Sequence, residues 1–250
     1  MNVFLVAILG LIVGSFLNAV IYRLHKKVSF LRGRSYCPWC KHDLSAKDLI
    51  PLFSFLFLKG KCRYCRKNIS WQYPLVEFGT MATFLILYWQ FGLTLDFFVY
   101  LIYTSLLMVI FVYDLKYYLI LDKVSVPAMA VAAICSYFIL NISILDMFVG
   151  VLIGGGFFLL QFYISKGKWI GGGDIRLGIV MGLMLGWPAI LPALFLAYVL
   201  GSIIGIILII SKKKKMKSQV PFGTFLSLAT FLTFIIGDVV IDYYQDLFLL

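Results

Sequence analysis

Long apolar stretches alternate with short polar segments along most of the chain. A helix that crosses a bilayer needs roughly 17–25 mostly apolar residues. Stretches that meet or approach this length lie at residues 2–22, 73–92, 95–113, 124–141, 144–165, 175–187, 189–210 and 222–241. The sixth is short, and its end near Trp187-Pro188 leaves seven spans as an alternative count. The pattern therefore predicts an all-α polytopic membrane protein with about eight transmembrane helices.

One further apolar stretch, at residues 49–58, is too short to cross a membrane. Its sequence, LIPLFSFLFL, predicts either an interfacial element or a buried part of a loop domain. The chain then divides into a first transmembrane helix at 1–22, a loop domain at 23–72 and a transmembrane core at 73–250. We expect the first helix to be retained, because no basic residues precede it and no small-residue cleavage site follows it.

The composition excludes a soluble domain. Hydrophobic residues make up 62% of the 250 residues and charged residues only 13%, whereas a soluble domain needs about a quarter of its residues charged. The formal net charge is +11, which in a soluble protein would suggest a nucleic-acid partner. In a membrane protein the same excess first has to be compared with the positions of the spans. That comparison favours membrane lipid as the surroundings and no nucleic acid.

All 22 Lys and Arg residues fall in alternate connections between the predicted spans, or, for Arg176, at the edge of the span that follows one. They occupy residues 23–71, 116–123, 166–176 and 212–217. The remaining connections and the carboxyl-terminal tail contain none. Because cytoplasmic loops of membrane proteins are enriched in Lys and Arg, this distribution predicts cytoplasmic basic loops and places both termini outside.

Four of the five cysteines lie in the loop domain as two C-x-x-C pairs, Cys37/Cys40 and Cys62/Cys65. Two such pairs can supply the four thiolates of a tetrahedral zinc site. Two disulfides are the alternative, but a cytoplasmic loop is in a reducing compartment. Four protein ligands leave no position open for water, so we predict a structural and not a catalytic zinc ion.

Two aspartates at predicted membrane boundaries are the candidates for chemistry. Asp114 ends the third span and Asp174 opens the sixth, and the topology places both at the cytoplasmic boundary. Carboxylates are costly at the edge of the hydrocarbon, so such residues are candidates for function. If they converge, one can activate water while the other protonates a carbonyl, as in aspartic proteases. The alternative is two ordinary helix-end aspartates, with Asp174 favoured by the helix dipole.

Two other acids have less defined roles. Asp122 follows Asp114 by eight residues; if the stretch were helical, the two would lie within roughly 80° around the axis and about 12 Å apart. A supporting role for Asp122 is consistent with that spacing. Glu77, at the start of the second span, either caps that helix or contacts a substrate.

The chain resembles the type IV prepilin peptidases, membrane aspartic proteases of the GxGD class, nearly from end to end. The motifs that carry the resemblance keep their order, spacing and predicted side of the membrane. They are Gly14-Ser15-Phe16-Leu17-Asn18, Tyr22-Arg23-Leu24, the two cysteine pairs, Ile50-Pro51, Lys59-Gly60-Lys61, Tyr73-Pro74-Leu75-Val76-Glu77, Asp114, Gly171-Gly172-Gly173-Asp174-Ile175-Arg176-Leu177 and Pro221-Phe222-Gly223. The length and layout look most like the Gram-positive, competence-type branch.

This resemblance implies a function at the cytoplasmic face of a bacterial plasma membrane. Asp114 and Asp174 would be the catalytic pair that cuts type IV prepilins or pseudopilins after the leader glycine, as in pilus assembly, competence and protein secretion. Many members also methylate the new amino terminus with S-adenosylmethionine, and Gly60 and Glu77 are the positions we would associate with that activity. The supporting positions implied around the pair are Gly171, Gly173, Asp122 and Arg176.

The sequence departs from the family pattern at two positions. Leu121 stands where the family usually has Pro, and Arg176 stands where it usually has Lys. Arg keeps the charge but changes the shape of the donor group. Neither position is one of the two aspartates. The oligomeric state is not defined by the sequence.

Two other functions compete with this one. A presenilin-like protease would share Tyr113-Asp114 and the GxGD motif, but its third motif, matched by Pro192-Ala193-Leu194, falls near the outer side. A transporter with a zinc-clamped domain could use the aspartates to carry protons. It should show internal repeats and broken helices, and the sequence shows neither.

Overall fold

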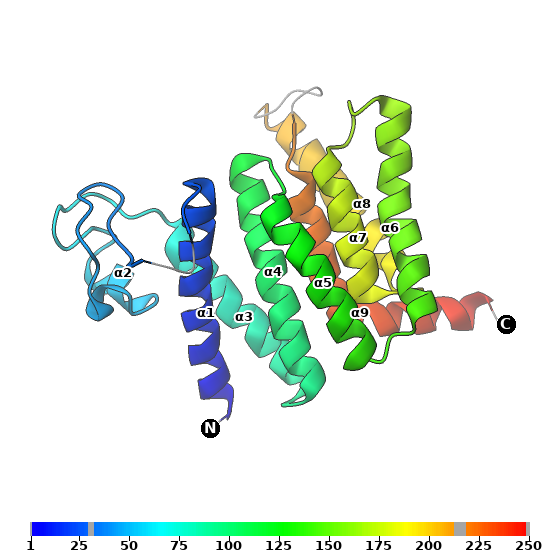
Figure 1. Ribbon diagram of the computed structural model, residues 1–250, viewed down its shortest axis with the longest axis horizontal. Coiled ribbons are helices and arrows are strands. Elements are labelled where there is room, and N and C mark those ends of the chain that lie inside the picture. Colours follow the sequence, from blue (N-terminus) through cyan, green and yellow to red (C-terminus); the bar gives the residue numbers. More distant parts are fainter. Residues whose placement is uncertain (1, 30–32, 213–218, 249–250) are drawn as a thin grey trace. The chain divides into compact units, whose positions relative to one another are not determined.

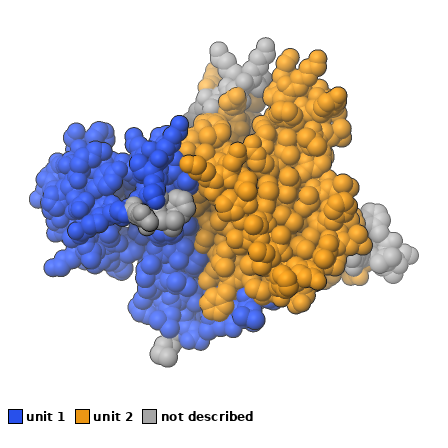
Figure 2. Space-filling view, in the orientation of Figure 1, with its two compact units in different colours: residues 1–97 blue, residues 98–250 orange. Residues whose placement is uncertain are grey.

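The computed structural model describes residues 2–29, 33–212 and 219–248 and is all-helical over those residues. Residues 1–97 and 98–250 form two compact units, which Figure 2 shows in separate colours. Besides the helices, the described residues contain two isolated β-bridges, both in the loop domain. The basic residues 213–215 and 217 lie outside the part of the chain that the structure describes.

The first unit consists of two long helices and the loop domain between them. Helix α1 spans Asn2–His25 and α3 spans Gln72–Phe91, while the loop carries the short helices η1 (Ala46–Asp48) and α2 (Phe53–Phe57) (Figure 1). Glycines on α1 allow α3 to approach closely: a Cβ on Gly10 would lie 2.6 Å from the Cα of Met81, and one on Gly14 would lie 2.7 Å from the Cα of Glu77. The α1–α3 pair therefore depends on backbone-to-backbone contact.

The second unit is a bundle of six helices, the first of which begins just before the boundary between the units. Their bounds are α4 Leu95–Tyr117, α5 Asp122–Phe138, α6 Ile144–Ser165, α7 Gly172–Leu185, α8 Ile190–Ile210 and α9 Phe222–Phe248. Each predicted span corresponds to one helix. The short sixth span is a separate helix, because α7 ends at Leu185 and the next residue, Gly186, adopts a φ of 65°.

Four helices, α1, α4, α6 and α8, are long and apolar enough to cross a membrane by length and composition. Residues 222–237 of α9 form a shorter apolar helix. The described residues thus confirm an all-helical, multi-span architecture. The full count of eight spans stays a prediction.

Helices α6 and α7 pack through facing glycines. A Cβ on Gly154 would lie 2.4 Å from the carbonyl oxygen of Gly178, and a Cβ on Gly182 would lie 2.4 Å from the carbonyl oxygen of Gly150. Real Cβ atoms do not approach a backbone that closely, so these positions require glycine. The contact fixes the short helix α7, which carries Asp174 at its amino-terminal end, against the longer α6.

Candidate functional site

The two C-x-x-C pairs of the loop domain form two turns with the same backbone pattern. The amide of Cys37 donates to the carbonyl of His42 at 3.0 Å, and that of Cys62 donates to the carbonyl of Lys67 at 2.9 Å. The residue after each second cysteine, Lys41 or Arg66, has a φ of 60°. Each pair is therefore held in a compact turn that directs two sulfur atoms to the same side.

The four sulfur atoms gather at one point, within 4.8 Å of one another. Cys37 Sγ and Cys65 Sγ are 3.8 Å apart and the described cysteines are not disulfide-bonded. A zinc ion with Zn–S bonds of about 2.3 Å requires sulfur–sulfur separations of roughly 3.8 Å. The residues therefore fit the structural zinc site predicted from the sequence, and the disulfide alternative is not supported.

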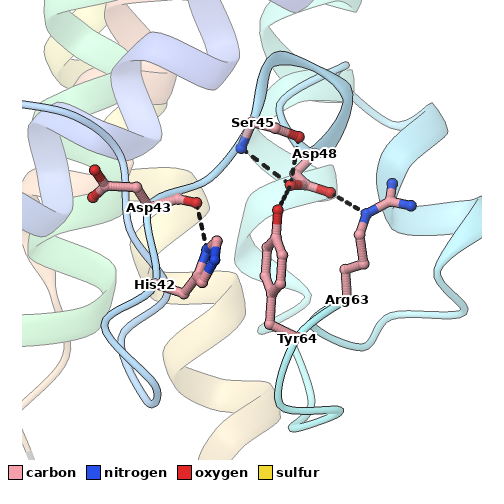
Figure 3. A network of polar contacts seen from close by, with 6 residues as sticks. All are labelled: His42, Asp43, Ser45, Asp48, Arg63 and Tyr64. Carbon is pink, nitrogen blue, oxygen red and sulfur yellow. Dashed lines mark hydrogen bonds and ion pairs between the residues drawn. The ribbon is translucent and has the colours of Figure 1, made fainter.

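A polar network joins the two cysteine turns (Figure 3). The imidazole of His42, beside the first turn, stacks on the ring of Tyr64 in the second, with ring centroids 3.6 Å apart. Asp48 accepts hydrogen bonds from the Tyr64 hydroxyl at 3.1 Å and from Arg63 Nε at 2.6 Å. The Ser45 hydroxyl donates to the same carboxylate at 2.8 Å. Side-chain contacts thus connect the two halves of the loop domain.

This network sets the charge state of Asp48. Burial alone would raise the pKa of the Asp48 carboxyl, but the hydrogen bonds from Arg63, Ser45 and Tyr64 outweigh it and lower the pKa to about 2. A carboxyl whose folded-state pKa is lowered stabilises the fold above its unfolded-state pKa, 3.8 here, and that contribution is lost as the pH falls toward 2. At cytoplasmic pH the stabilisation is complete.

Replacing Asp48 with Asn should destabilise the loop domain by about 1–3 kcal/mol, since Arg63 loses its charged acceptor. At neutral pH this would appear as faster transfer of zinc from the protein to a chromogenic chelator. Asp43→Asn is the matched control, because the Arg34–Asp43 pair is 3.9 Å apart with both side chains exposed. That control should change stability by less than about 0.5 kcal/mol. Equal release rates for Asp48→Asn and the parent would contradict the role of the network.

Asp114 lies in the last turns of α4 and is 5% exposed. Its Oδ2 accepts hydrogen bonds from the backbone N–H of Thr224 at 3.0 Å and from the Thr224 hydroxyl at 3.3 Å. Thr224 is in the first turn of α9, whose amino-terminal end favours a negative charge. The start of α9 thus holds one oxygen of Asp114 in a fixed position.

Asp174 lies in the first turn of α7, where its Oδ2 accepts a hydrogen bond from the amide of Gly171 at 3.0 Å. Ile120 lies next to both aspartates. A Cβ on Gly173, the residue before Asp174, would lie 2.9 Å from the Ile120 Cβ. A Cβ on Gly223 would lie 2.7 Å from the Ile120 Cδ1 and 3.0 Å from Asp114 Oδ2. The structure therefore brings the predicted pair together at one end of the second unit.

Asp122 lies on a different helix from Asp114, so the helical spacing considered for the two does not apply. The chain leaves α4 at Tyr117, passes through Tyr118 with a φ of 55°, and begins α5 at Asp122. The Asp122 carboxylate forms an ion pair with Arg176, two residues after Asp174. This pair joins the starts of α5 and α7 beside the two catalytic candidates.

Glu77 and Gly60, the candidates for methyl transfer, have contacts within the first unit. Glu77 is 7% exposed, and its Oε2 accepts the amide of Leu52 at 2.8 Å, while the Ser15 side chain also hydrogen-bonds to it. Gly60 closes the turn after α2 with a φ of 68°, and its amide donates to the carbonyl of Phe55. Glu77 therefore connects α1, α3 and the loop domain rather than capping α3.

Sequence reasoning did not identify Thr224 or Ile120 as site residues. The only signal for Thr224 was its place directly after Pro221-Phe222-Gly223, at the entry to the last helix, where Ser and Thr often bind backbone or side-chain partners. Ile120 is an apolar residue in a connection and gave no signal.

Two close carboxyls held by backbone amides can exchange a proton with a water and a carbonyl group, which is the chemistry of aspartic proteases.

Two family models match the chain in succession. The Bacterial Peptidase A24 N-terminal domain matches residues 8–91, and the Type IV leader peptidase family matches residues 101–206. A prepilin leader peptidase/N-methyltransferase of Bacillus subtilis is 32% identical over 95% of both chains. Proteins of the same name are 29% identical in Pseudomonas aeruginosa, over 92% of this chain and 89% of the relative, and 36% identical in Myxococcus xanthus, over 82% and 62%. No solved structure matches significantly.

Proposed function

Because the chain belongs to the type IV leader peptidase family, we propose that it is a membrane aspartic endopeptidase that removes the leader of prepilins or pseudopilins. The observation that carries the proposal is that Asp114 and Asp174 lie around the same residue, Ile120, which meets the Cβ position of Gly173 beside Asp174 and that of Gly223 next to Asp114 Oδ2. The same family supports amino-terminal methylation after cleavage, which is the second activity named for the relatives.

The dyad would work through one water molecule. One carboxylate accepts a proton from the water, whose oxygen attacks the carbonyl carbon of the leader glycine, while the other carboxyl donates its proton to the carbonyl oxygen. The tetrahedral intermediate then collapses, the C–N bond breaks, and the amine leaves with a proton returned by the dyad. Thr224 and Gly171 each donate to one oxygen of a carboxyl and so orient the two groups for this exchange.

We propose that the eight helices α1 and α3–α9 span a bacterial plasma membrane, with the dyad facing the cytoplasm. The ends that carry the basic residues are also the ends where Asp114, Asp122, Asp174 and Thr224 lie. The positive-inside rule then places this end in the cytoplasm. A reporter enzyme that works only outside the cytoplasm, fused after residue 250, should be active; an inactive fusion on an accumulated protein would reverse the assignment.

The Asp114 carboxylate lies where a side chain at position 223 would be, and glycine leaves that space open. A Cβ there would lie 3.0 Å from Asp114 Oδ2 and 2.7 Å from the Ile120 Cδ1. We expect Gly223→Ala to displace the carboxylate and to slow prepilin cleavage by about 10²-fold, because displacements of about 1 Å have effects of that size. The rate is measured on a co-expressed prepilin, relative to the amount of enzyme in the membrane.

Gly205→Ala is the control for this prediction. A Cβ at position 205, on α8, would meet nothing within 4 Å, so cleavage should proceed at the parental rate. Parental activity in Gly223→Ala would show that the close contact does not constrain Asp114.

The proposed methyl donor is S-adenosylmethionine, which supplies a methyl group to the new terminal amine. We associate this activity with the loop domain and with Gly60 and Glu77. Since Glu77 is engaged by Leu52 and Ser15, its contribution would be to position the loop segment. Mass spectrometry of a processed pilin should show both the cut after the leader glycine and a mass increase of one methyl group. An uncut pilin would contradict the peptidase, and a cut, unmethylated one would contradict only the transferase.

The competing functions are less compatible with these findings. Pro192 and Leu194, which matched the third presenilin motif, lie at the start of α8. The start of α8 follows the carboxyl-terminal end of α7, whereas Asp174 is at the amino-terminal end of α7. A transporter with proton-carrying aspartates has no counterpart in the family to which the chain belongs.

A further inference from the structure

Helix α2 and the residues before it present an apolar surface to the outside. The exposed fractions are 49% for Ile50, 55% for Phe53, 68% for Leu56 and 83% for Phe57. Phe55 alone among the residues of α2 is buried, with its ring 5.0 Å from that of Trp71. Removing a large apolar side chain from water stabilises a protein by about 1.5–3 kcal/mol. A group of such side chains left exposed therefore indicates a binding surface.

The position of this surface along the long helices is fixed by Glu77. The amide of Leu52, the residue just before α2, donates to Glu77 Oε2 at 2.8 Å. Glu77 is five residues beyond the start of α3, which corresponds to about 7.5 Å along the helix axis. Figure 1 shows α2 beside α1 rather than past its carboxyl end. The apolar surface therefore lies at the depth of the first turns of α3.

Other side chains at this depth are also exposed and apolar. Leu75 and Phe78, on the same turns of α3 as Glu77, are 64% and 55% exposed, and Phe16 on α1, next to Ser15, is 53% exposed. Lys59 and Lys61, which follow α2, are exposed. An apolar face next to basic residues is the combination that binds the interface of a membrane with anionic lipids.

We propose that residues 50–57 insert into the cytoplasmic leaflet of the bilayer and anchor the loop domain there, with Phe57 and Leu56 in contact with lipid. The carboxylate of Glu77 holds the segment at this depth. The proposal rests on the topology given above and does not depend on the peptidase chemistry. The loop domain would then lie against the cytoplasmic surface of the membrane.

The test is photocrosslinking in the full-length protein. The photoreactive amino acid p-benzoylphenylalanine replaces Phe57 in one variant and Trp39 in another; Trp39 is a 63% exposed aromatic residue of the first cysteine turn. Both are reconstituted in vesicles of phosphatidylethanolamine and phosphatidylglycerol, illuminated with and without added prepilin, and analysed by mass spectrometry. Lipid adducts are expected at position 57 and not above background at position 39.

Three outcomes would overturn the proposal: no lipid adduct at position 57, equal adducts at both positions, or an adduct to added prepilin in place of lipid. Zinc content equal to that of the parent shows that each variant is folded. If the Phe57 variant does not accumulate, Leu56 takes its place, with the same expectations. Failure of this test would leave the Asp114 and Asp174 assignments unaffected, because those are measured by cleavage.

Discussion

Replacing Asp174 with Asn is expected to slow prepilin cleavage by at least about 10²-fold, because proton transfer by a positioned side chain contributes roughly 10²–10⁴-fold. Asn has nearly the same shape, and its carbonyl oxygen can still accept the amide of Gly171. It cannot accept or release the proton that the reaction needs. Asp114→Asn should have an equally large effect for the same reason. Its amide oxygen can still accept from Thr224, so the side chain should keep its position. Cleavage is measured on a co-expressed prepilin by its change in mass.

The matched control for this pair is Asp96→Asn. Asp96 is in the first turn of α4, and Asp114 is eighteen residues further along the same helix, about 27 Å away along the axis. Cleavage by the Asp96 variant should equal that of the parent. All variants must accumulate in the membrane to comparable levels. Full activity in Asp114→Asn or Asp174→Asn would rule out the aspartyl dyad.

The second large effect is expected from the zinc site. The purified protein should contain about one zinc ion per chain, and Cys37→Ser should lose it, because a four-thiolate site needs every ligand. Apparent binding free energies of structural zinc are about 10–16 kcal/mol in isolated zinc-finger peptides, so loss of the ion should unfold the loop domain. Elemental analysis measures the zinc, and limited proteolysis between residues 35 and 69 measures the unfolding.

Cys135→Ser is the control for the zinc prediction. Cys135 lies on α5, outside the four-cysteine cluster, so this variant should keep its zinc and its resistance to protease. A full zinc content in Cys37→Ser, or none in the parent protein, would contradict the site.

The helices and the cysteine cluster could be predicted from local patterns. Apolar stretches long enough to cross a membrane became α1 and α3–α9, because each such stretch satisfies its backbone hydrogen bonds internally. The cysteine turns could be predicted because two residues between ligands already define how the pair faces a metal. Gly154, in the run Gly154-Gly155-Gly156 of α6, meets the backbone of Gly178, and small residues are typical of such close contacts between membrane helices.

The contacts that complete the sites could not be predicted in the same way. Asp114 and Thr224 are 110 residues apart, Asp122 and Arg176 are 54 apart, and Leu52 and Glu77 are 25 apart. Each contact depends on how helices pack, which hydropathy does not encode. The convergence of Asp114 and Asp174 was inferable because both lie at ends predicted to be on one side of the membrane. Their immediate partners were not.

The glycine contact between α6 and α7 has a consequence for how the enzyme adjusts to its substrate. Backbone touches backbone at two levels along the pair, so neither helix can slide past the other without a clash. Helices α6 and α7 are therefore expected to move as one rigid body, and Asp174 on α7 moves with them. A change in the distance between the carboxyls is then expected to come from a movement of α4 and α9 relative to this pair, with Asp114 and its partner Thr224 moving together. Asp174 would therefore keep its position relative to α6, whereas Asp114 would move relative to the α6–α7 pair.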